Sequence, residues 1–354
     1  MEDKSLEKLG YNQWSQGLDV ECIKEGFFLV RVIEVNKNSY MVSDGKREML
    51  AELSGKFLFD VAGNIDFPTV GDWVSAQIQD NYSSAVIHSV LPRKTLLKRK
   101  ESGKRIDFQL IASNIDFGLV MQSAAHINFN LLDRYFVMLN DSKIEPIAVI
   151  NKIDLLSPAE LEVLENNLLK MKKRYLLISI ITDRGIEELS NNLIPGKTYC
   201  LLGQSGVGKT SLLNNLLCTK RFKVNEVRKK DGKGRHTTVK RQLICLDSGC
   251  IFIDTPGIRE MGNFDIEDGI DQTFEEFSSY AQKCHFSDCT HLHEKGCAVI
   301  EAVKMGEIEE SRYKNYLKIR KESEYYKTLY HEKRKVEKSF GKMIKNYKKH
   351  KRKN

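Results

Sequence analysis

The sequence predicts a protein of several domains: an N-terminal β-barrel, a central α/β domain built on a parallel sheet, and a C-terminal α-helical domain. Three observations support this fold class. Short β-rich runs alternate with turn signals from Glu25 to about Leu91, which is typical of a small barrel. Strands alternate with helices from Leu110 onward, as in a parallel sheet. From about Asp265 the sequence is helical and increasingly charged, and a chain of 354 residues has room for such domains.

The barrel is predicted from five runs that are rich in β-branched and aromatic residues. Turn signals at Asn36–Asn38, Asp44–Gly45 and Val70–Asp72 punctuate them. Strand count alone does not distinguish an OB-fold from an SH3-like barrel, and we favour an OB-fold because it commonly handles nucleic acid. The predicted strands are Phe27–Ile33, Ser39–Val42, Glu48–Leu53, Trp73–Ile78 and Ser84–Ile87.

A basic segment, Pro92–Lys100, follows the barrel. Its proline and charges predict a solvated linker that also has the charge to contact phosphate. We therefore expect three domains, over residues 1–100, 101–264 and 265–354. The strands predicted for the α/β domain are Ile115–Met121, Pro146–Ile150, Tyr175–Ser179 and the hairpin of Arg241–Leu246 with Cys250–Asp254. The predicted helices are Asn130–Asn140, Pro158–Lys170 and Gly185–Leu193.

The pattern G-x-x-x-x-G-K-[ST] occurs at Gly203–Thr210, between the apolar run Tyr199–Leu202 and a helical segment. Strand, glycine-rich turn and helix predict a phosphate-binding loop, because the backbone N–H groups and the helix N-terminus can surround a polyphosphate. Lys209 is expected to reach the β- and γ-phosphates, and Thr210 to hold Mg²⁺. The residues expected to contact the nucleotide are Gly203, Gln204, Ser205, Gly206, Val207, Gly208, Lys209, Thr210 and Ser211.

The motif Asn151-Lys152-Ile153-Asp154 directly follows the predicted strand Pro146–Ile150. In open α/β sheets, ligands bind at the carboxyl ends of the strands. The carboxylate of Asp154 can accept hydrogen bonds from N1–H and the 2-amino group of guanine, a pair of donors that adenine lacks. We expect Asn151 and Lys152 to brace the base and the phosphate loop, so the predicted ligands are GTP and GDP.

Asp254-Thr255-Pro256-Gly257 follows another predicted strand and has the D-x-x-G spacing. Asp254 is expected to reach Mg²⁺ through water, and the N–H of Gly257 to contact the γ-phosphate. A basic loop, Gly232–Thr238, lies between the phosphate loop and this element. Either Thr237 or Thr238 is expected to complete the Mg²⁺ shell, and the sequence leaves open which.

The order of these motifs predicts a circular permutation. Ordinary small GTPases carry the phosphate loop first and N-K-x-D last, whereas here N-K-x-D precedes the phosphate loop by about 50 residues. The chain that follows Gly257 is therefore attached to the D-x-x-G element. Two alternatives remain open at this point: an RNA-binding assembly factor that uses GTP only as a ligand, and a P-loop kinase that transfers phosphate from ATP.

Composition excludes several other classes. No stretch approaches the roughly 18 to 20 uninterrupted apolar residues of a membrane helix, and the charged start Met1–Ser5 lacks the apolar core of a secretory signal. We expect a cytoplasmic monomer with no membrane contact. Eight cysteines without an export signal argue against a disulfide framework.

Positive charge accumulates near the C-terminus. The net charge is +8, and Ser339–Asn354 holds seven Lys or Arg and no acid, a composition that favours a polyanion. Upstream, Ser311–Tyr316 combines basic and aromatic side chains that suit contact with RNA.

Three cysteines, Cys284, Cys289 and Cys297, lie close together in the sequence with histidines among them. Three thiolates and one imidazole suit tetrahedral zinc, and four protein ligands indicate a closed, structural site. The candidates for the fourth ligand are His285, His291 and His293.

These motifs resemble the RsgA family, the bacterial ribosome small-subunit-dependent GTPases, over nearly the whole chain. The resemblance implies a GTPase that binds the small (30S) ribosomal subunit, hydrolyses GTP to GDP and phosphate during late subunit maturation, and contacts rRNA through its barrel and C-terminal domain. The segments that carry it are Val70–Val74, Val90–Lys94, Ala112–Asp116, Asn151–Asp154, Gly203–Thr210, His236–Thr238, Asp254–Gly257 and Cys284–Cys297.

The resemblance also implies roles for single residues. Ile258 stands where many GTPases carry the glutamine that orients the attacking water, and the resemblance points to His236 for that task. A histidine that faces solvent or RNA is the alternative. Ser179-Ile180 stands where the family has Ser-Ala as a second guanine contact, and His291 is the favoured zinc ligand. The expected catalytic residues are His236, Lys209 and Thr238.

Overall fold

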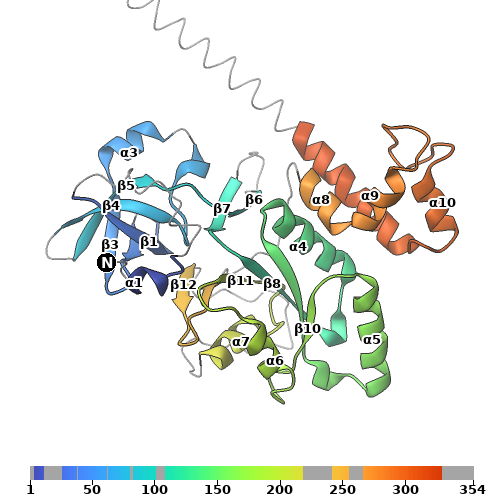
Figure 1. Cartoon of the computed structure of the whole chain (residues 1–354), viewed down its shortest axis with the longest axis horizontal. Helices are drawn as coiled ribbons and strands as arrows, with labels where there is room; N and C mark the ends of the chain where they lie inside the picture. The colour runs from blue at the N-terminus through green and yellow to red at the C-terminus, as the bar shows by residue number, and fades with distance from the viewer. Residues whose placement is uncertain are drawn as a thin grey trace, which may run out of the picture. The chain divides into compact units, whose positions relative to one another are not determined.

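The computed structural model describes residues 4–11, 26–37, 39–61, 63–79, 83–100, 108–217, 241–254 and 266–328. The chain forms two compact units (Figure 1). One combines Met1–Lys98 with Leu110–Glu260, and the other combines Arg99–Gln109 with Met261–Asn354. The barrel and the α/β sheet thus belong to one unit, and the boundaries expected after residues 100 and 264 stay a prediction.

Five strands close into a barrel, drawn in blue to cyan in Figure 1. β1 pairs with β2 and β4, β2 with β3, β3 in parallel with β5, and β5 with β4. This order confirms the predicted barrel and is that of an OB-fold. Alternating side chains such as Val30, Val32, Met49 and Ile87 fill its core. The strands are β1 (Phe28–Val35), β2 (Tyr40–Ser43), β3 (Glu48–Leu53), β4 (Trp73–Gln79) and β5 (Ser84–Val90), with helices α1 (Lys4–Glu7) and α3 (Gly55–Asp60).

The α/β sheet has the strand order β10-β9-β8-β11-β13-β12. All neighbours are parallel except β12, which is antiparallel to β13 and confirms the predicted hairpin. Phe117, Tyr199 and Phe252 stack across three neighbouring strands, with ring centroids 5.2 and 5.4 Å apart. The strands are β8 (Phe117–Ser123), β9 (Glu145–Asn151), β10 (Tyr175–Leu177), β11 (Thr198–Leu202), β12 (Gln242–Cys245) and β13 (Ile251–Asp254). The helices are α4 (Phe129–Asp141), α5 (Pro158–Lys170), α6 (Ile186–Asn192) and α7 (Lys209–Leu216).

The segment that we predicted as a linker contains a strand instead. β6 (Leu96–Lys100) pairs with β7 (Phe108–Ser113) in a two-stranded sheet. Leu97 is fully buried. The sequence did not indicate this burial, because lysines and arginines surround Leu97 in the chain. Just before β6, Arg93 donates from Nε and Nη2 to the two carboxylate oxygens of Asp72, each at 2.8 Å. The bidentate ion pair fixes the segment to the barrel.

A single buried arginine connects the barrel to the α/β sheet. Arg31 of β1 is only 1% exposed. Its hydrogen-bond acceptors are the carbonyl oxygens of Leu9, Gly71 and Asn114 and the hydroxyl of Thr198. Burial lowers the pKa of Arg31 to about 10, so the guanidinium is still protonated at neutral pH. β1 and β12 also pair at Glu34 and Gln242, which adds a backbone connection.

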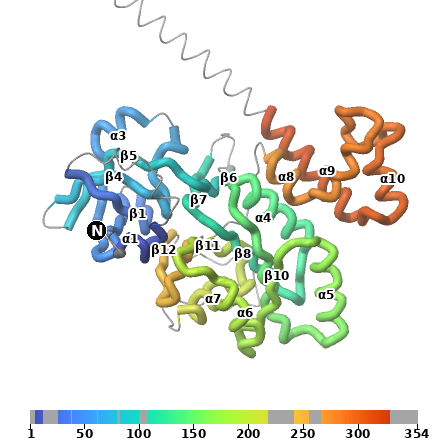
Figure 2. The backbone as a smooth tube through the Cα atoms, viewed as in Figure 1, coloured from blue at the N-terminus to red at the C-terminus, as the bar shows by residue number. Residues whose placement is uncertain are grey.

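The other unit contains the ends of β6 and β7 that face the Arg99–Gln109 segment, and its described residues from 266 to 328 are mainly helical (Figure 2). Phe274, Phe277 and Tyr316 form an aromatic core, in which Phe277 and Tyr316 stack with centroids 4.3 Å apart. Among the helices that the structure describes in either unit, none is long and apolar enough to cross a membrane. The helices of this unit are α8 (Glu267–Thr273), α9 (Glu275–Ala281), α10 (Ala298–Lys304) and a helix over residues 310–328.

Ser311–Tyr316, which we expected to contact RNA, is used largely within this unit. Tyr316 is 6% exposed. Arg312 lies over the ring of Phe274, 4.8 Å from its centroid, and forms an ion pair with Glu276. Basic and aromatic side chains can form cation–π contacts inside a protein as well as contacts with RNA. Composition alone does not distinguish these two uses. Lys314, with its side chain 70% exposed, does face solvent.

The connection through Arg31 can be tested by substitution. Arg31→Met keeps much of the side-chain volume but leaves several buried oxygen atoms without a donor, so we expect the free energy of unfolding to fall by about 3 to 5 kcal/mol. Urea denaturation measures this change. Arg47→Met, at an exposed position of the same barrel, is the control and should alter stability by less than about 0.5 kcal/mol. Equal stability of the two variants would contradict the role of Arg31.

Candidate nucleotide site and metal centre

The phosphate loop connects β11 to α7. Gly203, Gly206 and Gly208 all have left-handed backbone conformations, with φ of +133°, +81° and +106°. A Cβ atom at Gly203 would lie 2.2 Å from the carbonyl oxygen of Met121, and one at Gly208 would lie 2.4 Å from Nδ2 of Asn151. Both the backbone conformation and the close neighbours therefore require glycine at these two positions.

Lys209 lies at the start of α7 and points back over the loop. Its ammonium group donates to the carbonyl oxygens of Gly203 at 2.6 Å and Gln204 at 2.8 Å. Buried Leu212 and Leu213 hold α7 against the core of the sheet. The helix N-terminus and a lysine are thus presented together, which is the arrangement that binds a polyphosphate. Thr210 and Ser211 lie half-buried in the same helical turn.

The N-K-x-D motif contacts the phosphate loop directly. Asn151, the last residue of β9, donates from Nδ2 to the carbonyl oxygen of Val207 at 2.8 Å. Lys152 has a left-handed conformation, with φ of +66°, and its Nζ donates to the carbonyl oxygen of Gly206 at 2.9 Å. These two bonds join motifs that are more than fifty residues apart. The element expected to bind the base therefore supports the loop expected to bind phosphates.

Asp154 is oriented by a buried serine. The hydroxyl of Ser179 donates to Oδ1 of Asp154 at 2.5 Å and accepts from the N–H of Thr182 at 3.2 Å. Ser179 is fully buried. Oδ1 of Asn151 accepts from the N–H of Ile180 at 3.4 Å, so the Ser179-Ile180 segment contacts two residues of the N-K-x-D motif. Sequence reasoning considered these residues only as a guanine contact and missed this support.

Asp254 ends β13 and lies opposite Leu201 of β11 in the parallel register. Burial raises the pKa of Asp254, and the charge of Lys209 opposes that shift. The carboxylate is therefore close enough to the phosphate loop to interact with its lysine. The other residues predicted near the γ-phosphate lie outside the described residues, and their roles stay predictions. They are His236, Thr237, Thr238, Gly257 and Ile258.

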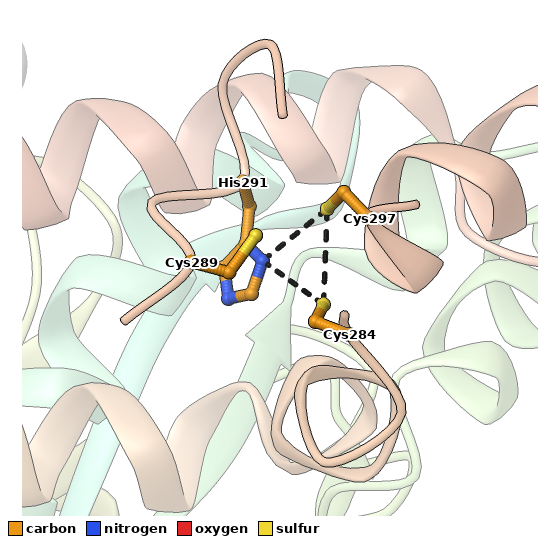
Figure 3. Close-up of side chains that lie close together, drawn as sticks. All are labelled: Cys284, Cys289, His291 and Cys297. Carbon is orange, nitrogen blue, oxygen red and sulfur yellow. Dashed lines mark hydrogen bonds between the residues drawn. The ribbon is translucent and has the colours of Figure 1, made fainter. Parts of the chain in front are cut away.

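The cysteine cluster forms a compact donor set (Figure 3). One donor atom from each of Cys284, Cys289, His291 and Cys297 lies within 4.8 Å of the others. The sulfur atoms of Cys284 and Cys297 are 3.8 Å apart, and Nδ1 of His291 is 3.6 and 3.4 Å from them. A tetrahedral zinc ion, with ligands at about 2.3 Å for sulfur and 2.0 Å for nitrogen, requires separations of about 3.8 and 3.5 Å. Cys284, His291 and Cys297 therefore have the spacing of a tetrahedral zinc site, and the sulfur of Cys289 lies within 4.8 Å of their donor atoms.

His291 is the histidine that joins the cluster, in preference to the neighbouring His285 and His293. It is 4% exposed, whereas His285 and His293 are exposed. Burial lowers the pKa of His291, which favours the neutral imidazole that a metal requires. The hydroxyl of Tyr313 donates to the His291 carbonyl oxygen at 2.5 Å, so the cluster is attached to the helix over residues 310–328.

Together, the fold and the nucleotide site define a circularly permuted P-loop GTPase, with phosphate loop, D-x-x-G aspartate and N-K-x-D motif on the carboxyl ends of β11, β13 and β9. The family model described as RsgA GTPase matches residues 90–264. Small ribosomal subunit biogenesis GTPase RsgA 1 of Bacteroides thetaiotaomicron is 36% identical over 326 residues, covering 91% of this chain and 90% of that protein. The chain therefore belongs to the RsgA family, and it is a GTPase.

Other relatives agree with this assignment. RsgA of Opitutus terrae is 33% identical over 331 residues, 91% of this chain and 90% of its own. The crystal structure of YjeQ from Thermotoga maritima matches with a TM-score of 0.63 and 31% identity, over 83% of this chain and 97% of that one. YloQ, described as a circularly permuted GTPase, matches with a TM-score of 0.60 at 24% identity, over 86% of this chain and 97% of its own, and supports the fold.

The hydroxyl of Ser179 can be tested for its part in nucleotide binding. Ser179→Ala removes the donor that orients Asp154, and we expect GDP to bind about tenfold more weakly, since a hydrogen bond to a charged group is lost. Fluorescence titration with a labelled GDP measures the affinity. Ser190→Ala removes a hydroxyl that bonds only within the exposed surface of α6 and should leave affinity unchanged. An unaltered Kd for the Ser179 variant would refute the orienting role.

Proposed function

We propose that this GTPase binds the small ribosomal subunit and hydrolyses GTP to GDP and phosphate during late maturation of that subunit. One observation carries the proposal: the relatives named as small ribosomal subunit biogenesis GTPases match 91% of this chain and 90% of their own length. The likeness extends beyond the nucleotide domain to the barrel and the metal-binding unit, which are the parts available for contacts with a large partner.

The proposed chemistry uses residues on the strand ends. Lys209 and the loop amides neutralise the phosphates, while Asp154 selects guanine. Thr210, together with Thr237 or Thr238, would hold Mg²⁺, and Asp254 would reach it through water. When bound, Mg²⁺ neutralises charge that develops on the phosphate oxygens. The remaining nucleotide contacts are proposed for Asn151, Lys152, Gly203, Gln204, Ser205, Gly206, Val207, Gly208, Ser211 and Gly257.

Hydrolysis needs a group that orients water. Ile258 occupies the place where many GTPases carry glutamine, and an aliphatic side chain has no hydrogen bond to offer a water molecule. His236, beside Thr237 and Thr238, is proposed to orient the attacking water. With this histidine as the proposed water-orienting group, we expect slow hydrolysis by the chain alone and faster hydrolysis on the small subunit.

Charge supports contact with rRNA. The chain carries a net charge of +8, and Ser339–Asn354 contributes seven basic residues with no acid. Such a segment gains affinity for RNA by releasing counterions from the phosphate backbone. The OB-fold barrel is the second proposed contact, because this type of barrel is widely used to bind nucleic acid. We propose that the protein acts in the cytoplasm as a monomer.

The donor set of Cys284, Cys289, His291 and Cys297 is proposed to hold one structural zinc ion. Four protein ligands leave no open position for catalysis. The described aromatic core of this unit is small, centred on Phe274, Phe277 and Tyr316, so that metal binding would contribute to the free energy of folding.

Stimulation by ribosomal particles tests the proposed function. GTP hydrolysis by the purified chain should rise at least about tenfold on addition of small ribosomal subunits, because the proposed partner would favour the catalytically competent conformation of the enzyme. Phosphate release under multiple turnover measures the rate. Large subunits at the same concentration are the control and should have little effect. No stimulation by small subunits, or equal stimulation by both, would refute the proposal.

Metal analysis tests the zinc assignment. We expect one zinc ion per purified chain, measured by mass spectrometry. Cys297→Ser should lose most of the zinc and unfold at a lower temperature, because a buried ligand is removed. Cys245→Ser is the matched control, since Cys245 is an exposed cysteine outside the cluster, and it should retain full zinc content. Zinc-free native protein would overturn the assignment.

A further inference from the structure

The loop between His291 and Cys297 is organised by one carboxylate. Oε1 of Glu294 accepts from the N–H of Thr290 at 2.9 Å and also from its hydroxyl group. Oε2 accepts from the N–H groups of Leu292 at 2.9 Å and His293 at 3.1 Å. The carboxylate therefore binds backbone donors on both sides of His291 in the sequence.

His291 needs this support because its backbone is unusual. Its φ is +63°, a left-handed conformation that non-glycine residues rarely adopt. Glycine would remove the strain but would also remove the imidazole. The left-handed turn brings Nδ1 within 3.4 to 3.6 Å of the sulfur atoms of Cys297 and Cys284. Holding the turn is thus equivalent to holding the nitrogen ligand in place.

We propose that Glu294 is a positioning residue of the metal centre, which fixes the backbone around His291 so that Nδ1 faces the metal before the ion binds. This inference rests on the proposed zinc site and extends it to a residue that does not touch the metal. Residues that orient the metal ligands without touching the metal commonly tune the affinity for the metal, and their loss weakens metal binding by about 10- to 100-fold. The hydroxyl of Tyr313 holds the same residue through a separate hydrogen bond to the His291 carbonyl oxygen.

Glutamine cannot replace Glu294 in this arrangement. Both carboxylate oxygens are acceptors, one for Thr290 and the other for Leu292 and His293. An amide has one acceptor oxygen, and its NH₂ group would face N–H donors on the other side. Glu294→Gln therefore leaves one half of the network unsatisfied while changing the side-chain volume very little.

The experiment compares the zinc affinity of full-length native protein and Glu294→Gln by competition with a chromogenic chelator. We expect the variant to bind zinc about 10- to 100-fold more weakly. Glu310→Gln removes the same charge from a side chain that is 71% exposed, and it should match native affinity. Cobalt spectra provide a second readout, since displacement of the imidazole shifts the visible bands of a tetrahedral Cys₃His site. Native affinity and native cobalt bands in Glu294→Gln would overturn the proposal.

A double-mutant comparison separates positioning from general stabilisation. In a His291→Ala background, Glu294→Gln should weaken zinc binding by less than about twofold, because the residue that it positions is absent. An equal loss in both backgrounds would refute action through His291. If Glu294→Gln does not fold, Thr290→Val replaces it and should weaken zinc binding several-fold, and native affinity in that variant would count against the proposal. Absence of zinc from the native protein would instead refute the zinc site itself.

Discussion

The buried guanidinium of Arg31 constrains the arrangement of the barrel and the α/β sheet. A charged group that is 1% exposed is tolerated only when its donors are satisfied. Its acceptors come from segments far apart in sequence, and one of them, Thr198, begins the strand that leads into the phosphate loop. Rotation of the barrel against the sheet would break these bonds and leave the charge buried without partners. The barrel and the strand that leads into the phosphate loop are therefore held together by the same buried side chain.

The nucleotide site depends on contacts that the permutation leaves intact. Asn151 and Lys152 precede the phosphate loop in sequence, yet they bond to the carbonyl oxygens of Val207 and Gly206 as neighbours in the sheet. Ser179 then holds Asp154 from the next strand end. The residues proposed to recognise the base and the loop proposed to bind the phosphates are consequently parts of one hydrogen-bonded network.

Sequence reasoning succeeded where the signal is local. Short β-rich runs separated by turn signals predicted the barrel strands, and fixed spacing predicted the Gly203–Thr210 loop and the cysteine cluster. It failed where the same residue type, such as arginine, is found both at the surface and in the interior. Nothing in the sequence marked Arg31 as buried, and Arg312 lay in a segment expected to contact RNA, yet Arg31 is buried and Arg312 packs on Phe274 through long-range contacts that no local pattern records. Glu294 gave no signal, because its importance arises from the left-handed turn at His291.

The hairpin of β12 and β13 connects the proposed nucleotide site with the barrel, because β13 ends at Asp254 and β12 lies beside β1. β13 ends at Asp254, and the chain continues from there to the unit that contains the cluster of Cys284, Cys289, His291 and Cys297. β12 begins just after the basic threonine loop and lies between β13 and β1 of the barrel, where Arg241 also donates to the carbonyl oxygen of Leu110 at 2.6 Å. In the sequence, the hairpin thus lies between Gly232–Thr238 and Asp254–Gly257, the two segments proposed to contact Mg²⁺ and the γ-phosphate. Gln242 of β12 pairs with Glu34 of β1, so the hairpin that carries Asp254 is also connected by backbone pairing to the barrel.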